Sequence, residues 1–392
     1  MKMKIELNKN FEKLSENYLF SEIALRVERK KREKNARQII SLGIGDVTNP
    51  LAPCVAEKMA HVSKSMGTKN GFCGYGNVGG VFALRRAIIE YYTQRGVELF
   101  ENEIFISDGA KSDLANLLDL FGDVEVAICD PVYPVYLDSA ILSGKRVRLL
   151  KATKGNDFLP TPNALPLSPF VIYLCSPNNP TGAVFSKENL KNWVNFALKS
   201  GSLIVFDAAY EAYISDENLP HSIFEIDGAR ECAIEVCSFS KMAGFTGVRC
   251  GWTIVPSDSA LNKMWARRQA TKFNGASYIS QMGALAALSP NGLRENKKNI
   301  ACYMENAKIL ADFLTKKGIF FCGGKHAPYV WLECPNKMDS WTFFDYLLEH
   351  AQIVGTPGVG FGEQGEHYFR LSCFAPKSNI IEATERLKKV LQ

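Results

Sequence analysis

Short apolar segments, each bounded by turn residues, alternate with helix-like stretches through the middle of the chain. One helix-like stretch, residues 187–201 (KENLKNWVNFALKSG), places Gly201 where a helix C-cap is expected. This alternation is typical of the α/β class, in which a mostly parallel sheet is flanked by helices. The segments that we expect to be strands are EIFIS (103–107), VAICD (126–130), FVIYLCS (170–176), SLIVFD (202–207), IEVCSFS (234–240) and GWTIVP (251–256).

The pattern changes after about Pro290. A long helix-like segment is followed by the apolar YVWLEC, by another helix and by the strand-like FRLSCF, which together predict a second, smaller α+β domain. The first forty residues form a charged helical arm with no obvious strand partner, and we expect this arm to pack on the small domain or on a partner subunit. The expected parts of the chain are the N-terminal arm (1–45), a large domain (46–288) and a small C-terminal domain (289–392).

Length and charge agree with a globular protein that binds small molecules. The chain has 392 residues, enough for two domains, and 46% of them are hydrophobic. Lys and Arg exceed Asp and Glu by 46 − 41 = 5, a basic balance too small to indicate nucleic-acid binding. The basic run RVERKKREKNAR (26–37) carries acidic residues at helical spacing, so we interpret it as a solvated helix face rather than a polyanion site.

Cysteine usage and the N-terminal sequence favour a cytoplasmic protein. The eleven cysteines form no CxxC pair and mostly lie in apolar segments, which indicates reduced thiols rather than a disulfide framework. The first residues lack the apolar core of a signal peptide, and no stretch approaches the roughly 18 uninterrupted apolar residues of a membrane span. We therefore expect a cytoplasmic location and no membrane partner.

Two common kinds of cofactor site are disfavoured. Gly74, Gly76 and Gly79 satisfy GxGxxG, but the nicotinamide-binding motif needs a strand directly before it, and KSMGTKNGFC is not strand-like. The chain has no GxxxxGK[ST] loop and no HExxH motif, and its five histidines are scattered. We therefore expect no metal and no dinucleotide.

A strand-end aspartate and a lysine some thirty residues later indicate pyridoxal phosphate. Asp207 ends an apolar segment, and Lys241 lies between serines and a glycine-rich turn. The lysine amine can condense with the cofactor's aldehyde, while the aspartate can pair with the ring nitrogen and keep it protonated. Taken singly, each residue is weak evidence, because a strand-end aspartate is more often a helix N-cap and most lysines are surface charges.

Neighbouring segments converge on the same ligand. Asn179, in SPNNPTG, can donate to the phenolic oxygen of the pyridine ring, although Asn, Pro and Gly also dominate ordinary turns. Tyr210, three residues after Asp207, can share that oxygen. Tyr133, in DPVYPVYLD, can stack on the ring, although an aromatic residue after a strand is more commonly core. The candidate phosphate ligands are Ser238, Ser240, Arg249 and the helix-start amides near Ala110 and Lys111.

The longer motifs resemble one family. With Asn179, Asp207, Tyr210, Lys241 and Arg249 in this order, the chain resembles fold-type I aminotransferases. Several strings between about residues 10 and 375 narrow the resemblance to the LL-diaminopimelate aminotransferase family. These strings are SLGIGDVTNPL, GYG, SDGAKSD, DPVYPVYLD, CSPNNPTG, SFSKMAGFTGVRCGW, FNGAS and TPGVGFG.

The resemblance implies a role for each matched position. Lys241 would carry pyridoxal 5'-phosphate and act as general base, and Asp207 would face the ring nitrogen. Arg370 would grip the substrate's α-carboxylate, while Tyr18 and Gly45 would line the substrate pocket. The residues implied to surround the cofactor are Ala110, Lys111, Tyr133, Asn179, Tyr210, Ser238, Ser240 and Arg249, of which Lys111, Tyr133 and Asn179 would also contact substrate.

The resemblance also implies a homodimer with shared active sites. Tyr75 would reach the cofactor, and Asn274 the substrate, from the neighbouring subunit. The implied reaction interconverts LL-diaminopimelate and 2-oxoglutarate with tetrahydrodipicolinate and glutamate, supplying precursors of lysine and peptidoglycan. The family commonly has a glutamate shortly after GYG, whereas this sequence has Val78 at or near that position. A missing carboxylate there would weaken recognition of the substrate's distal ammonium group.

Other functions remain open at this point. A broad-range or aromatic aminotransferase, or a β-elimination lyase, would show nearly the same cofactor residues. A lyase would release ammonia without needing an oxo-acid acceptor. From different classes, a nicotinamide oxidoreductase would use GYGNVG, and a catalytically silent regulator would keep the fold without turnover.

Overall fold

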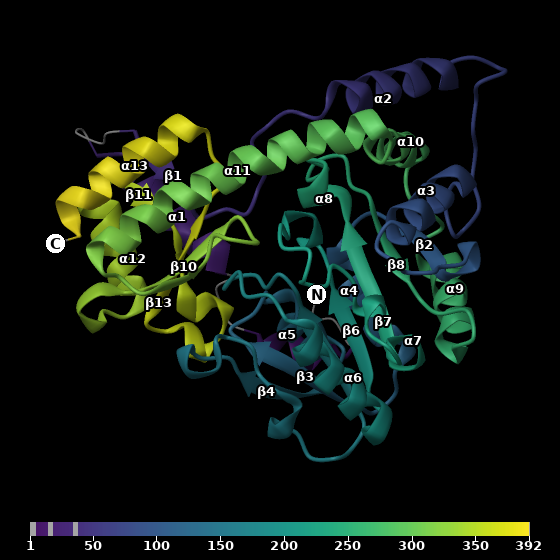
Figure 1. Ribbon diagram of the computed structural model, residues 1–392, viewed down its shortest axis with the longest axis horizontal. Coiled ribbons are helices and arrows are strands. Elements are labelled where there is room, and N and C mark those ends of the chain that lie inside the picture. The colour runs from purple at the N-terminus through teal and green to yellow at the C-terminus, as the bar shows by residue number, and fades with distance from the viewer. Residues whose placement is uncertain (1–4, 15–18, 34–37, 392) are drawn as a thin grey trace.

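The computed structural model describes residues 5–14, 19–33 and 38–391. Two sheets organise these residues (Figure 1). A large mixed sheet of seven strands has the order β2-β8-β7-β6-β5-β3-β4, and a four-stranded sheet has the order β12-β13-β10-β9. A two-stranded pair, β1-β11, lies beside the smaller sheet. The α/β fold with a second, smaller α+β unit agrees with the sequence pattern.

All six predicted strands of the large sheet are present. Neighbouring strands from β4 to β7 pair in parallel, whereas β8 is antiparallel to both β7 and β2. The sequence did not indicate β4, because four of its six residues are exposed at the sheet edge and two of those are arginines. The strands are β2 (Ile104–Ser107), β3 (Glu125–Asp130), β4 (Arg146–Lys151), β5 (Phe170–Cys175), β6 (Leu203–Asp207), β7 (Ala233–Ser238) and β8 (Gly251–Ile254).

Helices cover the large sheet, so its central strands are buried on both faces and are apolar without alternation. The predicted helix at 187–201 is α6 (Lys187–Ser200), capped by Ser186 and ended by Gly201 at φ 70°. The other helices of this part are α2 (Pro53–Met66), α3 (Phe82–Thr93), α4 (Ala110–Asn116), α5 (Val135–Leu142), α7 (Ala229–Cys232), α8 (Phe239–Met242), α9 (Ala260–Lys272) and α10 (Tyr278–Ala287).

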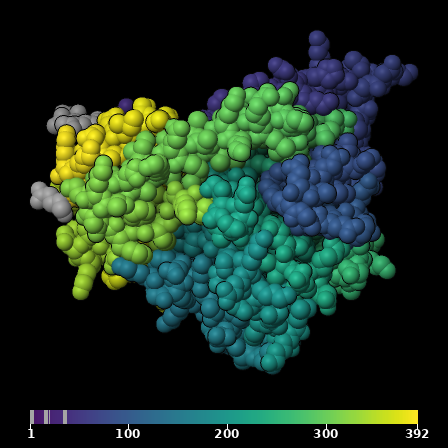
Figure 2. Space-filling model, viewed as in Figure 1, coloured from purple at the N-terminus to yellow at the C-terminus, as the bar shows by residue number. Residues whose placement is uncertain are grey.

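The predicted long helix after Pro290 is α11 (Pro290–Lys317), which runs from the large sheet to the smaller one (Figures 1 and 2). The smaller sheet and its helices enclose a second hydrophobic core. The remaining elements of this part are β9 (Phe321–Gly323), β10 (Tyr329–Glu333), α12 (Ser340–His350), β11 (Ile353–Val354), β12 (Thr356–Pro357), β13 (Tyr368–Ser372) and α13 (Lys377–Val390).

Short 3-10 helices connect many of these elements. The turn after β6 is one of them, and it carries residues of the candidate site. They are η1 (Lys9–Lys13), η2 (Glu101–Glu103), η3 (Leu117–Leu120), η4 (Lys154–Asn156), η5 (Pro162–Ala164), η6 (Glu211–Tyr213), η7 (Ile223–Glu225), η8 (Pro335–Lys337), η9 (Gly358–Phe361) and η10 (Glu363–Gly365).

The N-terminal segment contacts the C-terminal part of the chain. Helix α1 (Leu19–Lys31) lies along α12, where Arg26 pairs with Asp345 and Lys30 pairs with Glu349 at 2.6 Å. Strand β1 (Ile40–Ser41) pairs in parallel with β11. The sequence showed no obvious strand partner for this arm, because the partner lies some 300 residues away in sequence and is itself only two residues long.

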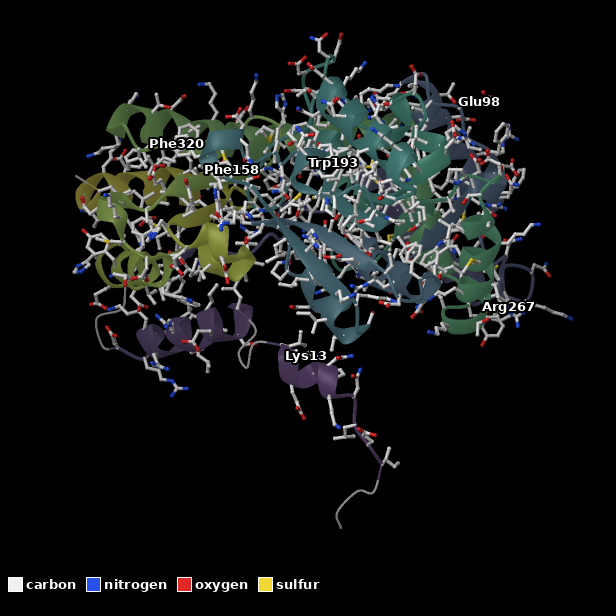
Figure 3. All side chains as sticks on the ribbon, turned by 90° about the horizontal axis from the view of Figure 1, so that it is seen from below. Lys13, Glu98, Phe158, Trp193, Arg267 and Phe320 are labelled. Atoms are coloured by element: carbon white, nitrogen blue, oxygen red, sulfur yellow. The ribbon has the colours of Figure 1, made fainter. Side chains whose placement is uncertain are left out.

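Aromatic residues fill the junction between the two sheets. Phe158, labelled in Figure 3, meets Trp331 of β10 edge-on, with ring centroids 6.5 Å apart. Trp193 of α6, labelled in the same view, lies fully buried within the large domain. Across the described residues, no helix is both long enough and apolar enough to cross a membrane.

Candidate active site

One cavity of about 370 Å³ lies at the carboxyl ends of the parallel strands. Because the ends of β5, β6 and β7 meet at one edge of the sheet, the polar residues that follow these strands face the same space. The structure brings together there most of the residues singled out from the sequence. They are Gly45, Ala110, Lys111, Tyr133, Asn179, Asp207, Tyr210, Ser238, Ser240, Lys241, Arg249 and Arg370.

Asp207, the last residue of β6, presents a buried carboxylate to this cavity. Its Oδ2 accepts a hydrogen bond from the Tyr136 hydroxyl at 2.5 Å, and its Oδ1 accepts from the Ala209 amide at 2.9 Å. Burial raises the pKa of Asp207, while these two hydrogen bonds lower it. The carboxylate forms no ion pair with any described residue, so it is available to a cationic group of a ligand.

Lys241, in the short helix α8, points its amine into the same cavity. Nζ donates to the carbonyl oxygen of Gly45 and lies 5.4 Å from the centre of the Phe374 ring. Burial lowers the pKa of Lys241 to about 8, and the positive charges of Arg370 and Arg249 lower it further, whereas Asp46 raises it. A lysine with such a pKa is partly neutral near pH 7 and can act as a nucleophile or a base.

Arg370 is a buried cation that has no anionic partner in the part of the chain that the structure describes. It extends from β13 and is 2% exposed, and its two terminal nitrogens donate to Asn179 Oδ1 at 2.6 Å and to the Gly43 carbonyl at 2.7 Å. Its guanidinium forms no ion pair with a described residue, and Nε is buried without a hydrogen-bond partner among them. Burial lowers the pKa of Arg370. This position suits a carboxylate supplied by a ligand.

Hydroxyl groups and a guanidinium gather at the opposite end of the cavity. Ser238 Oγ donates to Ser240 Oγ at 2.9 Å, and Arg249 Nη1 donates to Ser240 Oγ at 3.3 Å. Gly109 precedes α4 at φ 133°, and a Cβ at this position would lie 2.5 Å from Arg249 Nη2. The start of α4, with Ala110, therefore lies close against Arg249. These donors together suit an anionic group such as a phosphate.

Aromatic side chains form the walls between these two ends. The Tyr210 hydroxyl lies 2.7 Å from that of Tyr329, and burial raises the pKa of Tyr210 well above its usual value, so it is a hydrogen-bond donor. Lys111 Nζ lies 6.0 Å from the centre of the Tyr133 ring. Tyr133 meets Tyr136 edge-on, with ring centroids 6.0 Å apart.

Two of the described residues predicted for the site do not line this cavity. Tyr75 and Asn274 line a separate cavity of about 980 Å³, and the Tyr75 side chain is 94% exposed. The prediction that both residues reach the site of a neighbouring subunit stays a prediction. Tyr18 lies outside the described residues. Val78, at the position where the family pattern suggests a glutamate, is partly buried in the loop before α3.

Sequence reasoning missed several lining residues. Asp46 lies in SLGIGDVTNPL, but no strand end marked it. Tyr329 was interpreted only as part of a strand. Its hydroxyl meets that of Tyr210 through tertiary packing, which the local sequence does not reveal. Tyr136 lies in the same DPVYPVYLD segment as Tyr133, and this proximity was the one available signal for it.

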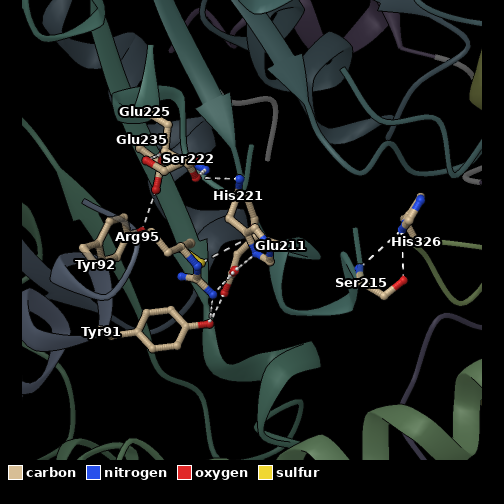
Figure 4. Close-up of polar contacts among 12 residues, drawn as sticks. Tyr91, Tyr92, Arg95, Glu211, Ser215, His221, Ser222, Glu225, Glu235 and His326 are labelled. Carbon is tan, nitrogen blue, oxygen red and sulfur yellow. Dashed lines mark hydrogen bonds and ion pairs between the residues drawn. The ribbon is translucent and has the colours of Figure 1, made fainter. Parts of the chain in front are cut away.

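A buried polar network supports the turn that carries Tyr210. Glu211 is 3% exposed and accepts from the Tyr91 hydroxyl at 2.6 Å, while its other oxygen lies 3.1 Å from Arg95 Nη2 and 2.9 Å from His221 Nδ1 (Figure 4). Despite burial, these partners lower the pKa of Glu211. The network therefore ties η6 to the α3 region and fixes the backbone next to Tyr210.

Comparison with known proteins gives the family. The family described as aminotransferase class I and II matches residues 37–387. The chain is 48% identical to an LL-diaminopimelate aminotransferase of Agathobacter rectalis, over 98% of this chain and 99% of that protein. A second relative of this name, from Lawsonia intracellularis, is 47% identical over 98% of both chains. The chain belongs to the LL-diaminopimelate aminotransferase family.

The fold comparison agrees with this assignment. A solved structure of L,L-diaminopimelate aminotransferase from Chlamydomonas reinhardtii matches with a TM-score of 0.94 and 42% identity, covering 100% of both chains. As a member of this aminotransferase family, the protein is a pyridoxal-phosphate-dependent transferase. The GxGxxG string is therefore not a dinucleotide motif, and in the structure it follows helix α2 rather than a strand.

The residues present fit this cofactor. The buried Asp207 carboxylate lacks a cationic partner among the described residues, as expected of a group that pairs with a protonated ring nitrogen. Lys241 supplies an amine of lowered pKa to an aldehyde, and Arg249 with Ser238 and Ser240 supplies donors to a phosphate. The Arg249 guanidinium, the Asp207 carboxylate and the Lys241 amine thus match the phosphate, the ring nitrogen and the aldehyde of pyridoxal phosphate.

Proposed function

We propose that this enzyme transfers the amino group of LL-diaminopimelate to 2-oxoglutarate, giving tetrahydrodipicolinate and glutamate, and catalyses the reverse reaction. The observation that carries the proposal is identity of 42–48% over nearly the whole chain to proteins with this activity in their names. The cavity residues support it, because they supply an amine, a buried carboxylate and a buried arginine in one site. Tetrahydrodipicolinate and diaminopimelate place the reaction in the supply of lysine and peptidoglycan precursors.

Each of three residues has a distinct role in this proposal. When bound, pyridoxal phosphate supplies an electron sink for charge that develops at the substrate's α-carbon. Asp207 would hold positive charge at the ring nitrogen, and Lys241, whose pKa is lowered to about 8, would take the proton from the substrate's α-carbon as general base. Arg370 binds the α-carboxylate, which would neutralise its buried charge.

We propose that the chain divides into the parts expected from its sequence, and the lining of the cavity supports this division. Residues 46–288 contribute Lys241 and Asp207, residues 289–392 contribute Arg370, and residues 1–45 contribute Gly45 to the cavity wall. The site therefore needs both domains to be in contact. We further propose a cytoplasmic location, which the eleven free cysteines support.

We also propose a homodimer in which Tyr75 and Asn274 complete the partner's site. The exposure of Tyr75 and its place in a cavity separate from this chain's own site support the proposal. The test mixes Lys241→Ala and Asn274→Ala subunits, each inactive as a homodimer. Random exchange should restore about a quarter of wild-type activity, because half of the dimers are mixed and each has one intact site. Absence of any recovery in verified mixed dimers would contradict shared sites.

The experiment that tests the proposed reaction follows the cofactor's absorbance after LL-diaminopimelate is added without an oxo acid. Conversion of bound pyridoxal phosphate into pyridoxamine phosphate would establish cofactor, reaction type and substrate together. A response to aromatic amino acids but not to LL-diaminopimelate would keep the aminotransferase and replace the substrate. Release of ammonia with unchanged cofactor would indicate a lyase.

A broader substrate range is a second candidate, favoured by Val78. The loop of Val78 offers no carboxylate at that position to a distal ammonium group. If this residue limits specificity, Val78→Glu should raise kcat/KM for LL-diaminopimelate relative to that for an aromatic amino acid, while Val78→Ala should leave the ratio unchanged. An unchanged ratio in Val78→Glu would remove the basis for this candidate.

A further inference from the structure

A buried tyrosine that the proposed mechanism does not use contacts the carboxylate at its centre. Tyr136 of α5 is 1% exposed and donates its hydroxyl to Asp207 Oδ2 at 2.5 Å. Burial raises the pKa of Tyr136 well above its usual value, so the hydroxyl keeps its proton and is the donor of this bond. The other oxygen of Asp207 accepts from one donor among the described residues, the Ala209 amide.

The Tyr136 hydroxyl bears on whether Asp207 is charged. Burial raises the pKa of Asp207, and two hydrogen bonds, from Tyr136 and from Ala209, oppose it. If one donor is lost, the charged form of a buried carboxylate is destabilised more than the neutral form. A neutral Asp207 no longer attracts the proton of the cofactor's ring nitrogen, so the ring loses its positive charge.

A second buried tyrosine holds Tyr136 in place. The rings of Tyr136 and Tyr173 are stacked, with centroids 5.1 Å apart and planes 28° from parallel. Tyr173 is also 1% exposed, and its hydroxyl donates to the Leu114 carbonyl of α4 at 2.7 Å. The first turn of α4 lies against Arg249 at the phosphate end of the cavity. The two tyrosines thus connect the two ends of the cofactor site.

We infer that Tyr136 is a positioning residue that keeps Asp207 ionised and facing the cofactor's ring nitrogen, and that Tyr173 fixes Tyr136 for this task. The inference rests on the pyridoxal phosphate site proposed above and adds to it a determinant of the ring's protonation. Neither tyrosine needs to contact the substrate for this role. Their effect should therefore be on kcat rather than on KM.

The test compares Tyr136→Phe with a matched control, Tyr92→Phe. Tyr92 is a buried tyrosine that donates to the buried carboxylate of Glu235 at 2.5 Å (Figure 4), and it also accepts from Trp252. Both variants thus lose a buried bond of the same kind and length. Tyr92 does not line the cofactor cavity, so its loss reports the structural cost alone.

Each holoenzyme is loaded with pyridoxal phosphate labelled with nitrogen-15 in the ring. In Tyr136→Phe, the nitrogen resonance should move towards that of an unprotonated pyridine, because the proton passes to Asp207. Its kcat should fall about 10- to 100-fold, the factor that one hydrogen bond to a charged group contributes, with KM within about twofold of wild type. Tyr92→Phe should keep the wild-type resonance and kcat despite a lower melting temperature.

The outcomes separate this inference from the proposed function. A wild-type resonance and kcat in folded Tyr136→Phe would overturn the inference while leaving the cofactor site intact. Failure of the wild-type protein to bind pyridoxal phosphate would instead overturn the proposed site and this inference with it. If Tyr136→Phe does not fold, Tyr173→Leu decides, since it keeps the Tyr136 hydroxyl but removes the ring stacked on Tyr136. A smaller displacement of the resonance in the same direction would support the inference. The absence of any displacement would overturn it.

Discussion

The lowered pKa of Lys241 predicts how fast the cofactor-free enzyme reacts with an aldehyde at neutral pH. Only the neutral amine attacks an aldehyde, and the Lys241 pKa is lowered from 10.5 to about 8. At pH 7, about 9% of such an amine is neutral, against about 0.03% of an ordinary lysine, which is a difference of roughly 300-fold. Burial is the largest cause, so the effect depends on how far the folded chain shields the amine from water.

Asp46 offers a way to move this pKa. Its negative charge raises the pKa of Lys241, so Asp46→Asn should lower it. Because Asp46 is exposed, solvent screens its charge, and we expect a change of about 0.3–1 pH unit. Asp46→Glu keeps the charge and is the matched control. Its midpoint should stay near that of the wild-type protein.

The assay measures the rate at which cofactor-free protein captures pyridoxal phosphate between pH 6 and pH 10, followed by absorbance. Each rate is divided by that of a model amine peptide, which removes the titration of pyridoxal phosphate itself. The wild-type profile should bend near pH 8, and the Asp46→Asn profile at a lower pH. A wild-type ratio that stays flat from pH 6 to pH 10, or an upward movement of the bend in Asp46→Asn, would refute the electrostatic reasoning.

Three further substitutions have definite expected outcomes. Arg370→Lys should lower kcat/KM about 100-fold, through a higher KM. The reason is that a lysine ammonium cannot bind Asn179 and a substrate carboxylate together as the planar arginine guanidinium does. A loss confined to kcat in steady-state kinetics would contradict this. Gly362→Ala places a Cβ 1.8 Å from Asp130 Oδ1 at φ 133°, so denaturant unfolding should show a loss of about 2–4 kcal/mol. Trp193→Ala should cost about 3–5 kcal/mol of stability and leave kcat unchanged, and a melting curve like that of wild type would contradict this.

The sequence by itself determined six of the seven strands of the large sheet and marked the polar residues that follow them. The central strands are buried on both faces, so each forms an apolar run that is visible without structural information, and the polar residues directly after them mark the carboxyl edge of the sheet. Asn179, Asp207, Lys241 and Arg249 were therefore identified from local context. Gly201 likewise marked the end of α6 through its required left-handed backbone.

Only the tertiary structure decided which side chains meet across the fold. Edge strand β4 exposes charged residues and gives no apolar run, and β1 finds a partner near residue 353 that no local pattern could indicate. The Tyr136 hydroxyl reaches Asp207 from a residue 71 positions away, and Arg370 reaches Asn179 across 191 positions. The pKa of Lys241 likewise follows from burial and from charges that distant segments place around it, because electrostatic interactions depend on distance in space and not in sequence.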